Sequence, residues 1–268
     1  MIHGRYERKY EVQGDAEKLR MTFLNAARAL GYRTDPAGPD GTYELCSLYF
    51  DTPELTALHA NADGDYIHVK YRIRRYARTD QLFYEIKFKR GDVIFKVRRA
   101  LPAHTIEIEL CRREFRDLLL ASGSSTLIKA SNLGEVNRLV PVTLVRYRRT
   151  ALIDAPEERV CLDQYLAFGP PTTDQRVWFA PLLAQAESRL GVLELKCHPQ
   201  AVHRRMLTLG RFATRPIVRF SKYCEAAAWL NDDPAAYGEN PDMALRHRPE
   251  LPAYLRTGRR ILQNDRME

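Results

Sequence analysis

The chain has 268 residues, 45% of them hydrophobic and 28% charged, a composition typical of a soluble globular protein with one large domain or two small ones. Its 42 lysines and arginines exceed its 34 aspartates and glutamates, and the net charge of +8 favours an acidic partner such as a nucleotide, polyphosphate, nucleic acid or anionic membrane surface. Five scattered cysteines without a C-x-x-C motif exclude a disulfide framework and a cysteine zinc site. With no leader and no apolar run of 18 residues, we expect a cytoplasmic protein.

The first hundred residues predict mostly strands, because apolar and charged residues alternate with a period of two. A strand is expected over residues 5–11, and Asp15 then caps a helix. A strand over 42–51 leads into a short helix that begins at Thr52 with Pro53 in its first turn. Three further strands joined by short turns predict an antiparallel meander over residues 66–76, 81–90 and 92–100.

The rest of the chain continues this alternation of strands and helices. A helical insertion is expected over residues 105–138, and further strands are expected over 141–153, 158–167 and 190–197. Two helices follow, one from His198 and one from Cys224. We therefore expect an α+β fold in which eight antiparallel strands close a β-barrel, with helices packed outside it.

The end of the chain differs in composition from the residues before it. Residues 231–268 are rich in aspartate, proline, asparagine and arginine, which predicts a peripheral or partly disordered extension, with a docking helix as the alternative. The sequence therefore predicts one domain over residues 1–230 and an extension over 231–268. No P-loop motif and no strand-linked G-x-G-x-x-G motif occurs, which argues against P-loop and Rossmann chemistry.

The polar faces of the predicted strands carry mainly cations and a few carboxylates. The face includes Arg5, Glu7, Lys9, Lys70, Arg72, Arg74, Glu85, Lys87, Lys89, Lys96, Arg98, Arg159, Asp163, Glu194 and Lys196. A single such strand is the ordinary solvated face of an antiparallel sheet. Cations gathered on neighbouring strands repel one another unless an anion lies among them, so the whole set favours a sheet curved around a polyanion.

These motifs, in this order, resemble a known family. The set comprises Arg5-x-Glu7-x-Lys9, Ser47-x-x-x-Asp51, Lys70-x-Arg72-x-Arg74, Glu85-x-Lys87, Tyr147-x-Arg149, Arg159-x-x-x-Asp163, Glu194-x-Lys196 and Ser221-Lys222-Tyr223. It looks like the VTC-type polyphosphate polymerase domain of the triphosphate tunnel metalloenzyme superfamily, from about residue 3 to residue 230. The wider superfamily usually opens with E-x-E-x-K, and Arg5 in place of the first glutamate favours the VTC branch.

The resemblance implies an eight-stranded antiparallel β-tunnel with a basic lumen, open or nearly open at both ends. It also implies an enzyme that transfers the γ-phosphoryl group of ATP to a growing polyphosphate chain with the help of Mn²⁺ or Mg²⁺. The partners are then ATP and polyphosphate. Export of the product would need a separate membrane protein, which would hold the chain at the inner face of a membrane. No specific nucleic acid is expected, because Tyr6, Tyr10, Tyr71, Tyr84 and Phe88 alternate to the face opposite the cations.

The same resemblance assigns roles to individual residues. The residues predicted to be catalytic are Lys9, Arg72, Arg74, Lys87, Arg149 and Arg159. Those predicted to bind substrate are Lys96 and Lys222, together with Lys70, Lys89, Arg98 and Lys196 on the same strand faces. Glu194 matches the metal-binding glutamate, and Glu7 and Glu85 are the weaker metal candidates. Arginine forks suit bidentate contact with phosphate, whereas lysine acts as a point charge.

Several other residues have plainer interpretations. Asp163 is interpreted as an ion-pair partner of Arg159 on the same strand face. Tyr49 and Asp51 are expected to pack and to cap rather than to catalyse, and Arg148 is expected to point outward.

Three functions remain open at this level. The first is polyphosphate synthesis, the second is hydrolysis of tripolyphosphate or nucleoside triphosphates in the same tunnel, and the third is a binding module without turnover. A phosphate-chain end is already an anion and needs no protein base, whereas water needs a positioned carboxylate or lysine. The few carboxylates on the cationic face favour transfer to phosphate.

Overall fold

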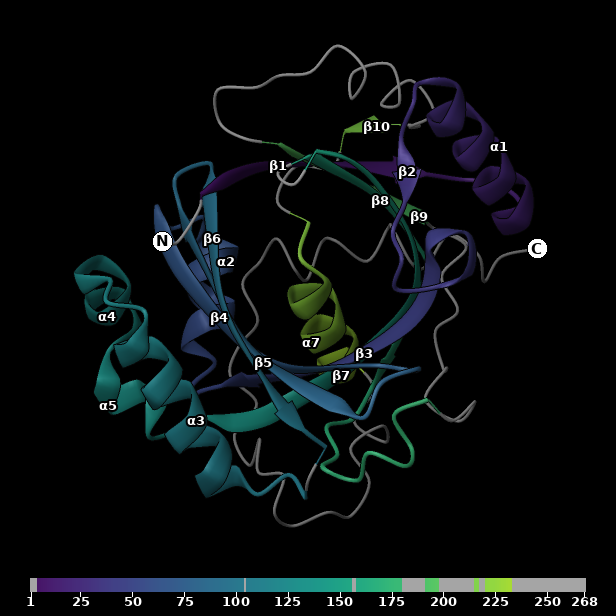
Figure 1. The fold of residues 1–268 in the computed structure, drawn as a ribbon. Helices are drawn as coiled ribbons and strands as arrows, with labels where there is room; N and C mark the ends of the chain where they lie inside the picture. The colour runs from purple at the N-terminus through teal and green to yellow at the C-terminus, as the bar shows by residue number, and fades with distance from the viewer. Residues whose placement is uncertain are drawn as a thin grey trace.

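The computed structural model describes residues 4–103, 105–155, 158–179, 191–197, 215–216 and 220–232. Eight antiparallel strands form a closed ring with helices around it (Figure 1). The strands of the ring are β1 (Arg5–Val12), β3 (Thr42–Asp51), β4 (Ile67–Tyr76), β5 (Gln81–Arg90), β6 (Val93–Pro102), β7 (Val140–Ala155), β8 (Glu158–Gly169) and β9 (Gly191–Cys197). The prediction of an eight-stranded antiparallel α+β fold is therefore confirmed.

The strands follow the order β1-β6-β5-β4-β3-β7-β8-β9, and β9 returns to β1 to close the ring. This closing pair is long, because β1 pairs with β9 from Tyr6 to Val12. In contrast, β1 pairs with β6 only at Arg5 and Tyr6. Two short strands lie beside the ring: β2 (Arg33–Thr34) pairs with β7, and β10 (Arg215–Pro216) pairs with β1.

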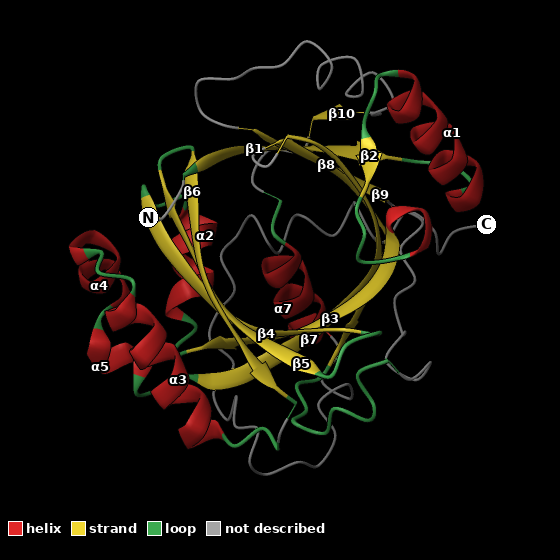
Figure 2. Cartoon of the chain, viewed as in Figure 1, coloured by secondary structure: helices red, strands yellow, loops and turns green. Residues whose placement is uncertain are grey.

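Helices cover the outer face of the ring in two groups (Figure 2). The outward apolar residues of β3, β4 and β5 pack against α3 (Ile108–Ala121), α4 (Ser125–Ser131) and α5 (Leu133–Val136), around the buried Phe115. Those of β7, β8 and β9 pack against α1 (Ala16–Ala29), which buries Phe23, Leu24 and Ala27. The alternation of strand side chains between two faces thus leaves the charged set on the inner face.

The local details of three helices are now clear. Asp15 caps α1 as predicted, since its carboxylate accepts a hydrogen bond from the Lys18 backbone N–H at 2.7 Å. The predicted start of the next helix was wrong, because α2 (Thr56–Asp63) begins four residues after Thr52. The Asp51 carboxylate fixes that start by accepting hydrogen bonds from the backbone N–H groups of α2. The helical insertion predicted at 105–138 is confirmed and consists of α3, α4 and α5.

The last described helix, α7 (Lys222–Asp232), occupies one end of the ring and lies at its centre in Figure 1. Its apolar residues pack against inward residues of β3, β7 and β8, in one cluster with Tyr49 and Tyr147. The Tyr223 ring stacks on Tyr49, with centroids 5.2 Å apart, and its hydroxyl donates a hydrogen bond to Asp51 at 2.5 Å. The resemblance implied a tunnel open or nearly open at both ends, and α7 lies across one of these ends.

Two predicted segments lie outside the described residues: the helix from His198 and the extension beyond residue 232. Among the helices that the structure describes, none combines the length and apolar character needed to cross a membrane.

Candidate functional site

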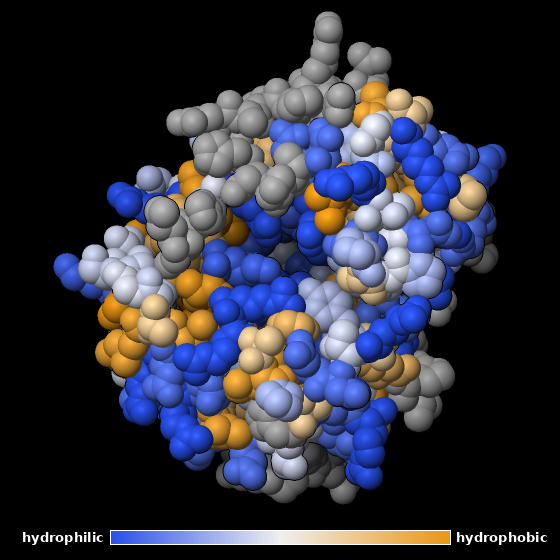
Figure 3. All heavy atoms as spheres, viewed as in Figure 1, coloured by the Kyte–Doolittle hydropathy of each residue, from blue (hydrophilic) through white to orange (hydrophobic). Residues whose placement is uncertain are grey.

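The inner face of the ring surrounds a cavity that opens away from α7. Figure 3 shows this face of the molecule hollowed at its centre, with hydrophilic residues lining the hollow. The described lining residues are Arg5, Glu7, Lys9, Tyr43, Tyr49, Lys70, Arg72, Arg74, Tyr76, Lys87, Ile94, Lys96, Arg98, Tyr147, Arg149, Arg159, Glu194, Lys196, Ser221 and Lys222. They come from all eight ring strands and from the start of α7.

Cations dominate this lining. Twelve of the described lining residues are lysine or arginine and two are glutamate, Glu7 and Glu194. Glu85 and Asp163 are fully buried against the same cations and raise the carboxylates to four. Twelve cations against four carboxylates leave a formal excess of +8 around one cavity. Such an excess attracts a polyanion strongly, because a low-dielectric wall concentrates the field.

One group of cations surrounds a single carboxylate, and we call it the Glu85 cluster: Glu85 with Arg72, Arg74, Lys96 and Arg98. The carboxylate lies 2.6 Å from Arg72 and 3.2 Å from Lys96, with Arg98 at 3.6 Å and Arg74 at 3.7 Å. These four cations hold the pKa of Glu85 well below its usual range, although burial acts in the opposite direction. The Lys96 and Arg98 side chains keep 30% and 34% of their surface exposed, so their donors remain open to the cavity.

A second group has two carboxylates, and we call it the Glu194 cluster: Glu194 and Asp163 with Arg149, Lys196 and Lys222. Arg149 donates a bidentate pair of hydrogen bonds to Asp163 at 2.6 and 2.7 Å and a third to Glu194 at 3.0 Å. Lys222 lies 2.6 Å from Asp163 and 2.8 Å from Glu194. None of the five side chains is more than 8% exposed. Lys222 thereby ties α7 to β8 and β9.

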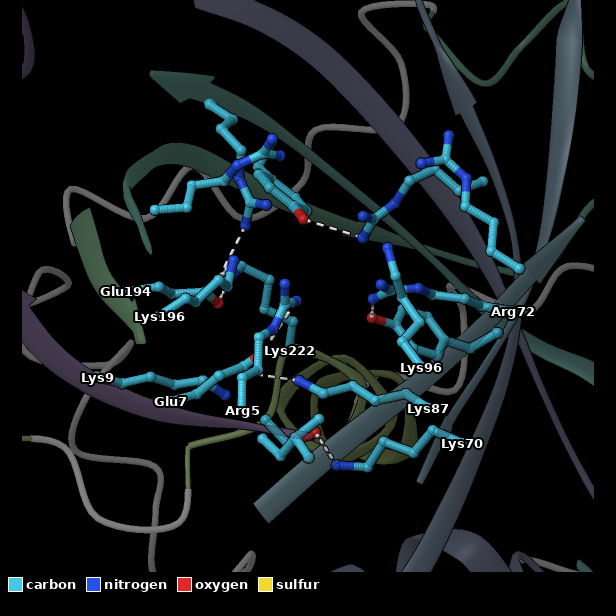
Figure 4. Close-up of a pocket in the computed structure, with 18 of the residues that line it drawn as sticks. Arg5, Glu7, Lys9, Lys70, Arg72, Lys87, Lys96, Glu194, Lys196 and Lys222 are labelled. Atoms are coloured by element: carbon cyan, nitrogen blue, oxygen red, sulfur yellow. Dashed lines mark hydrogen bonds and ion pairs between the residues drawn. The ribbon is translucent and has the colours of Figure 1, made fainter. Parts of the chain in front are cut away.

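Figure 4 shows the two sides of the cavity facing each other, with Glu194, Lys196 and Lys9 opposite Arg72 and Lys96. Near Lys9, the carboxylate of Glu7 accepts a hydrogen bond from Lys87 at 2.8 Å. Burial acts to raise the pKa of Glu7, but the lysines around it, Lys87 first among them, hold that pKa well below its usual range.

The start of α7 is held by two lysines. Lys9 donates a hydrogen bond to the Phe220 carbonyl oxygen at 2.7 Å. Lys70 donates one to the Ser221 hydroxyl at 3.0 Å and another to the Asn61 side chain. The first turn of α7 is thus fixed within the cationic cavity.

Burial among other cations lowers the pKa of two lysines, Lys70 and Lys96. It lowers the pKa of Lys70 to about 8, mainly through desolvation. Glu85 supports the charge of Lys96, but desolvation and the neighbouring arginines still lower that pKa to about 8. A bound polyanion would remove this cost, because an opposite charge restores the protonated form.

The donors suit a divalent metal only with help from a ligand. Among the described residues, no three acidic, histidine or cysteine side chains come together as a metal cage. Glu7 and Glu194 both line the cavity, and the low pKa of each carboxyl keeps it ionised. A hard cation prefers oxygen ligands and can take most of them from phosphates. Glu85 is buried among four cations and is not among the described lining residues, and its metal role stays a prediction.

The structure brings most of the predicted site residues together around the cavity. All six residues predicted to be catalytic line it, as do five of the six predicted to bind substrate. Lys89 is the exception, because it lies on β5 beyond the described lining. The pairing of Asp163 with Arg159 was wrong: Arg159 pairs with Asp35 at 3.3 Å, while Asp163 belongs to the Glu194 cluster. Their roles in catalysis and binding stay predictions.

Sequence reasoning missed the tyrosines of the lining, namely Tyr43, Tyr49, Tyr76 and Tyr147. The signal was present, since Tyr49 and Tyr147 lie two residues from Ser47 and Arg149 on their strands. Tyr49 accepts a hydrogen bond from Arg72 at 3.0 Å, and Tyr147 accepts one from Arg74 at 3.1 Å. Arg148 points outward as predicted, toward Glu44 and Glu17 at 3.4 Å.

The family model described as the VTC domain matches residues 4–231. No curated protein matches the sequence.

Solved structures similar to this chain are distant. HpAC1 from Hippeastrum, named as an adenylyl cyclase and reported to have a dominant triphosphatase activity, is 12% identical, with 76% of this chain and 82% of that chain covered and a TM-score of 0.38. A protein from Vibrio parahaemolyticus assigned as an adenylate cyclase is 11% identical, covering 78% and 86%, with a TM-score of 0.37. The inorganic triphosphatase NE1496 is 14% identical, covering 83% and 94%, with a TM-score of 0.28. Similarities this distant say nothing about activity.

Proposed function

The chain belongs to the VTC domain family, and we propose that it is a polyphosphate polymerase that transfers the γ-phosphoryl group of ATP to a growing polyphosphate chain. The observation that carries this proposal is the excess of cations around the cavity, twelve lysines and arginines against four carboxylates. This excess is larger than one bound triphosphate neutralises, so it supports a site that holds a donor triphosphate and an anionic acceptor chain together.

The arrangement of donors supports phosphoryl transfer. The reaction passes through a loose transition state whose charge lies on the phosphoryl and leaving oxygens, so positioning and charge stabilisation provide most of the catalysis. Arg72 is fixed by Glu85 on one side and by the Tyr49 hydroxyl on another, which holds its fork in place before substrate arrives. Lys96 and Arg98 keep exposed donors beside it. We assign the Glu85 cluster to hold the transferring phosphates.

The acceptor needs no protein base, because the end of a polyphosphate chain is already an anion. The carboxylates of the site are poor bases in any case. Glu7, Glu194 and Asp163 are held by lysines and arginines that keep the pKa of each carboxyl below its usual range. This feature favours transfer to phosphate over activation of water.

Mn²⁺ or Mg²⁺ would bind at Glu194, with Glu7 as the second carboxylate of this chain near it and phosphate oxygens completing the ligands. Such an ion supplies charge neutralisation at the phosphate oxygens. Lys196 and Lys222 now contact the Glu194 carboxylate at 2.7 and 2.8 Å and would orient it.

Hydrolysis of tripolyphosphate or nucleoside triphosphates in the same cavity is the second candidate. It is favoured by Lys70 and Lys96, whose pKa values of about 8 allow a neutral amine to accept a proton from water. A binding module without turnover is the third, since the cations alone explain affinity for polyphosphate.

The test is to incubate the purified chain with ATP and Mn²⁺ and to separate long polyphosphate from orthophosphate on a gel. Arg72→Ala and Glu194→Ala probe the two sides of the cavity. Arg148→Ala is the matched control, because Arg148 lies on β7 but points away from the cavity toward Glu44. We expect long chains from the wild type and the control and none from the other two variants.

The other outcomes separate the candidates. Orthophosphate without chains would make the protein a triphosphatase and overturn the polymerase proposal. No turnover with tight, metal-independent binding of tripolyphosphate would leave the binding module.

We further propose that residues 1–230 form the catalytic domain and that residues 231–268 are a separate extension. Export of the product would then depend on a membrane protein as partner. Truncation after residue 232, where α7 ends, with activity retained would support a separate extension. Failure to recover the chain with membranes in a pull-down would argue against the partner.

A further inference from the structure

The inner wall of the ring changes character toward its open mouth. On β4 the inward cations end at Arg74, and Tyr76 follows as the next inward residue. On β5 the inward charges end at Glu85, and Phe83 lies beyond it on the same face. Tyr43 of β3 lines the cavity at this same end. Away from α7, the wall thus turns from charged to aromatic on neighbouring strands.

These aromatic residues contact one another, and with Arg98 we call them the mouth aromatic cluster: Tyr43, Tyr76, Phe83 and Arg98. The Tyr76 ring lies 5.6 Å from that of Tyr43 and 5.3 Å from that of Phe83, between centroids. The Arg98 guanidinium lies 3.6 Å from the Phe83 centroid and 5.8 Å from that of Tyr76. Tyr76 and Phe83 are half-buried, so part of each side chain reaches the surface, although Arg98 already lies over the Phe83 ring.

Aromatic faces and guanidinium planes are the groups that proteins use to stack nucleobases. A purely inorganic phosphate chain has no flat apolar part to place on them. A nucleoside triphosphate has one, at the end opposite its reactive phosphate. The aromatic cluster is therefore suited to the base of a nucleotide, whereas the cationic wall is suited to its phosphates.

The spacing along the wall fits such a ligand. Arg72 and Tyr76 are four residues apart on β4, which at the rise of an extended strand separates them by roughly 13 Å. Arg98 belongs both to this cluster and to the Glu85 cluster, so the two surfaces are continuous. A ligand with phosphates at Glu85 and a base at the mouth would contact both.

We propose that the mouth aromatic cluster binds the base of a nucleoside triphosphate whose phosphates lie against the Glu85 cluster. This inference rests on the proposed function in one respect, namely that the phosphoryl donor is a nucleotide. The cluster offers ring faces and a guanidinium plane, so recognition depends on stacking area. Purine nucleotides therefore bind more tightly than pyrimidine nucleotides, and ATP and GTP bind alike.

The test is calorimetric titration of ATP and of tripolyphosphate, each in buffer with EDTA so that binding is read without turnover. The variant is Tyr76→Leu with Phe83→Leu, which keeps apolar bulk but removes the ring faces. Tyr165→Leu is the matched control, because the Tyr165 side chain also lies under an arginine but on the outside of the strand ring. The Arg148 guanidinium is 4.7 Å from the Tyr165 centroid.

We expect the double variant to bind ATP about tenfold more weakly than the wild type, while its affinity for tripolyphosphate changes less than about twofold. Retained tripolyphosphate binding also shows that the variant is folded. The control should bind both ligands as the wild type does. Wild-type titrations should rank ATP and GTP above CTP and UTP.

Equal weakening for both ligands would overturn the proposal, because the aromatic residues would then only support the wall. Unchanged ATP binding in the double variant, or a wild type that binds neither ligand, would overturn it as well. A chain that binds ATP through these rings but makes no polyphosphate would overturn the proposed function and leave this inference standing.

Discussion

The two clusters of the cavity bury cations in different ways. In the Glu194 cluster three cations share two carboxylates, and no side chain is more than 8% exposed. In the Glu85 cluster four cations share one carboxylate, and Lys96 and Arg98 remain about a third exposed. Removing one member of a fully buried cluster leaves an uncompensated charge and destabilises the fold, whereas cations that stay partly exposed keep donors for a ligand. The comparison predicts stability effects on one side and binding effects on the other.

The largest expected effect comes from breaking the Glu194 cluster. Asp163→Asn removes the carboxylate that pairs with Arg149 and Lys222 and leaves two poorly compensated buried cations. The free energy of unfolding should fall by about 3–5 kcal/mol, measured by denaturant titration. Glu44→Gln is the control, because Glu44 pairs with Arg148 on the exposed outer face and should cost less than about 1 kcal/mol. Equal losses in the two variants would contradict the comparison.

Acid should weaken both clusters. The carboxyls around the cavity whose pKa is lower in the folded protein than in the unfolded chain are Glu7, Glu85, Asp163 and Glu194. Their stabilisation is fully present above the unfolded pKa near 4 and is lost as the pH falls toward the lower folded values. Glu225 acts in the opposite direction, because its folded pKa of about 7 lies above its unfolded value of 4.5. The stability gained when Glu225 takes up a proton is complete once the pH has fallen below that unfolded value.

The free energy of unfolding should therefore drop by about 3 kcal/mol or more between pH 5 and pH 3. Denaturant titrations at the two pH values measure it, and high salt is a useful control because buried pairs are little screened. A flat profile would mean that these carboxylates are not held by the cations.

On the Glu85 side the expected effect is on binding. Arg72→Ala removes a fork fixed toward the cavity, and the affinity for tripolyphosphate should fall roughly 10- to 100-fold, as for the loss of a charge-assisted hydrogen bond. The free energy of unfolding should change by less than about 1–2 kcal/mol, because Glu85 keeps Lys96 at 3.2 Å and Arg98 at 3.6 Å. Calorimetric titration measures the affinity for tripolyphosphate, and denaturant titration of the same sample measures the free energy of unfolding. A variant that loses stability but not affinity would reverse the assignment of the two sides.

The smallest effect is expected at the mouth. Arg159 is 39% exposed and pairs with Asp35 at 3.3 Å, so it is a well-solvated charge at the edge of the cavity. Arg159→Ala should weaken tripolyphosphate binding by about threefold or less, with a shallower salt dependence, because exposed charges contribute little. A loss as large as that of Arg72→Ala would show that the phosphates lie nearer the mouth than we propose.

The fold was predictable because period-two alternation also assigns each strand residue to a face. Because helices pack on the outer face of the ring, the apolar strand faces lie outward and the charged faces point inward, as Arg72 and Glu194 do. The partners of those charges were not predictable, since Asp163 could be matched to Arg159 by spacing but reaches Arg149 across the β7–β8 pair. The position of α7 was not predictable either, because its apolar residues fit equally well outside the ring.

The aromatic residues at the mouth show a further limit. Tyr76 and Phe83 lie on segments where most aromatic residues, such as Tyr71 and Tyr84, point outward into the core. Alternation along each strand puts Tyr76 on the face of Arg72 and Phe83 on that of Glu85, and the register between strands shows that the two rings end up side by side.

Closure of the ring has a consequence for how the chain folds. Lys9 pairs with Glu194, so the first strand finds its long partner only after almost two hundred residues have been synthesised. Contacts so distant in sequence form slowly, because the loop entropy is lost before the pairing is gained. Until then β1 is an unpaired edge, and its alternating Arg5, Glu7 and Lys9 are the kind of charges that discourage edge-to-edge aggregation. Pulse-labelled hydrogen exchange should find the β1 amides protected last. The same charges that line the cavity would then also limit aggregation until the β1–β9 pair forms.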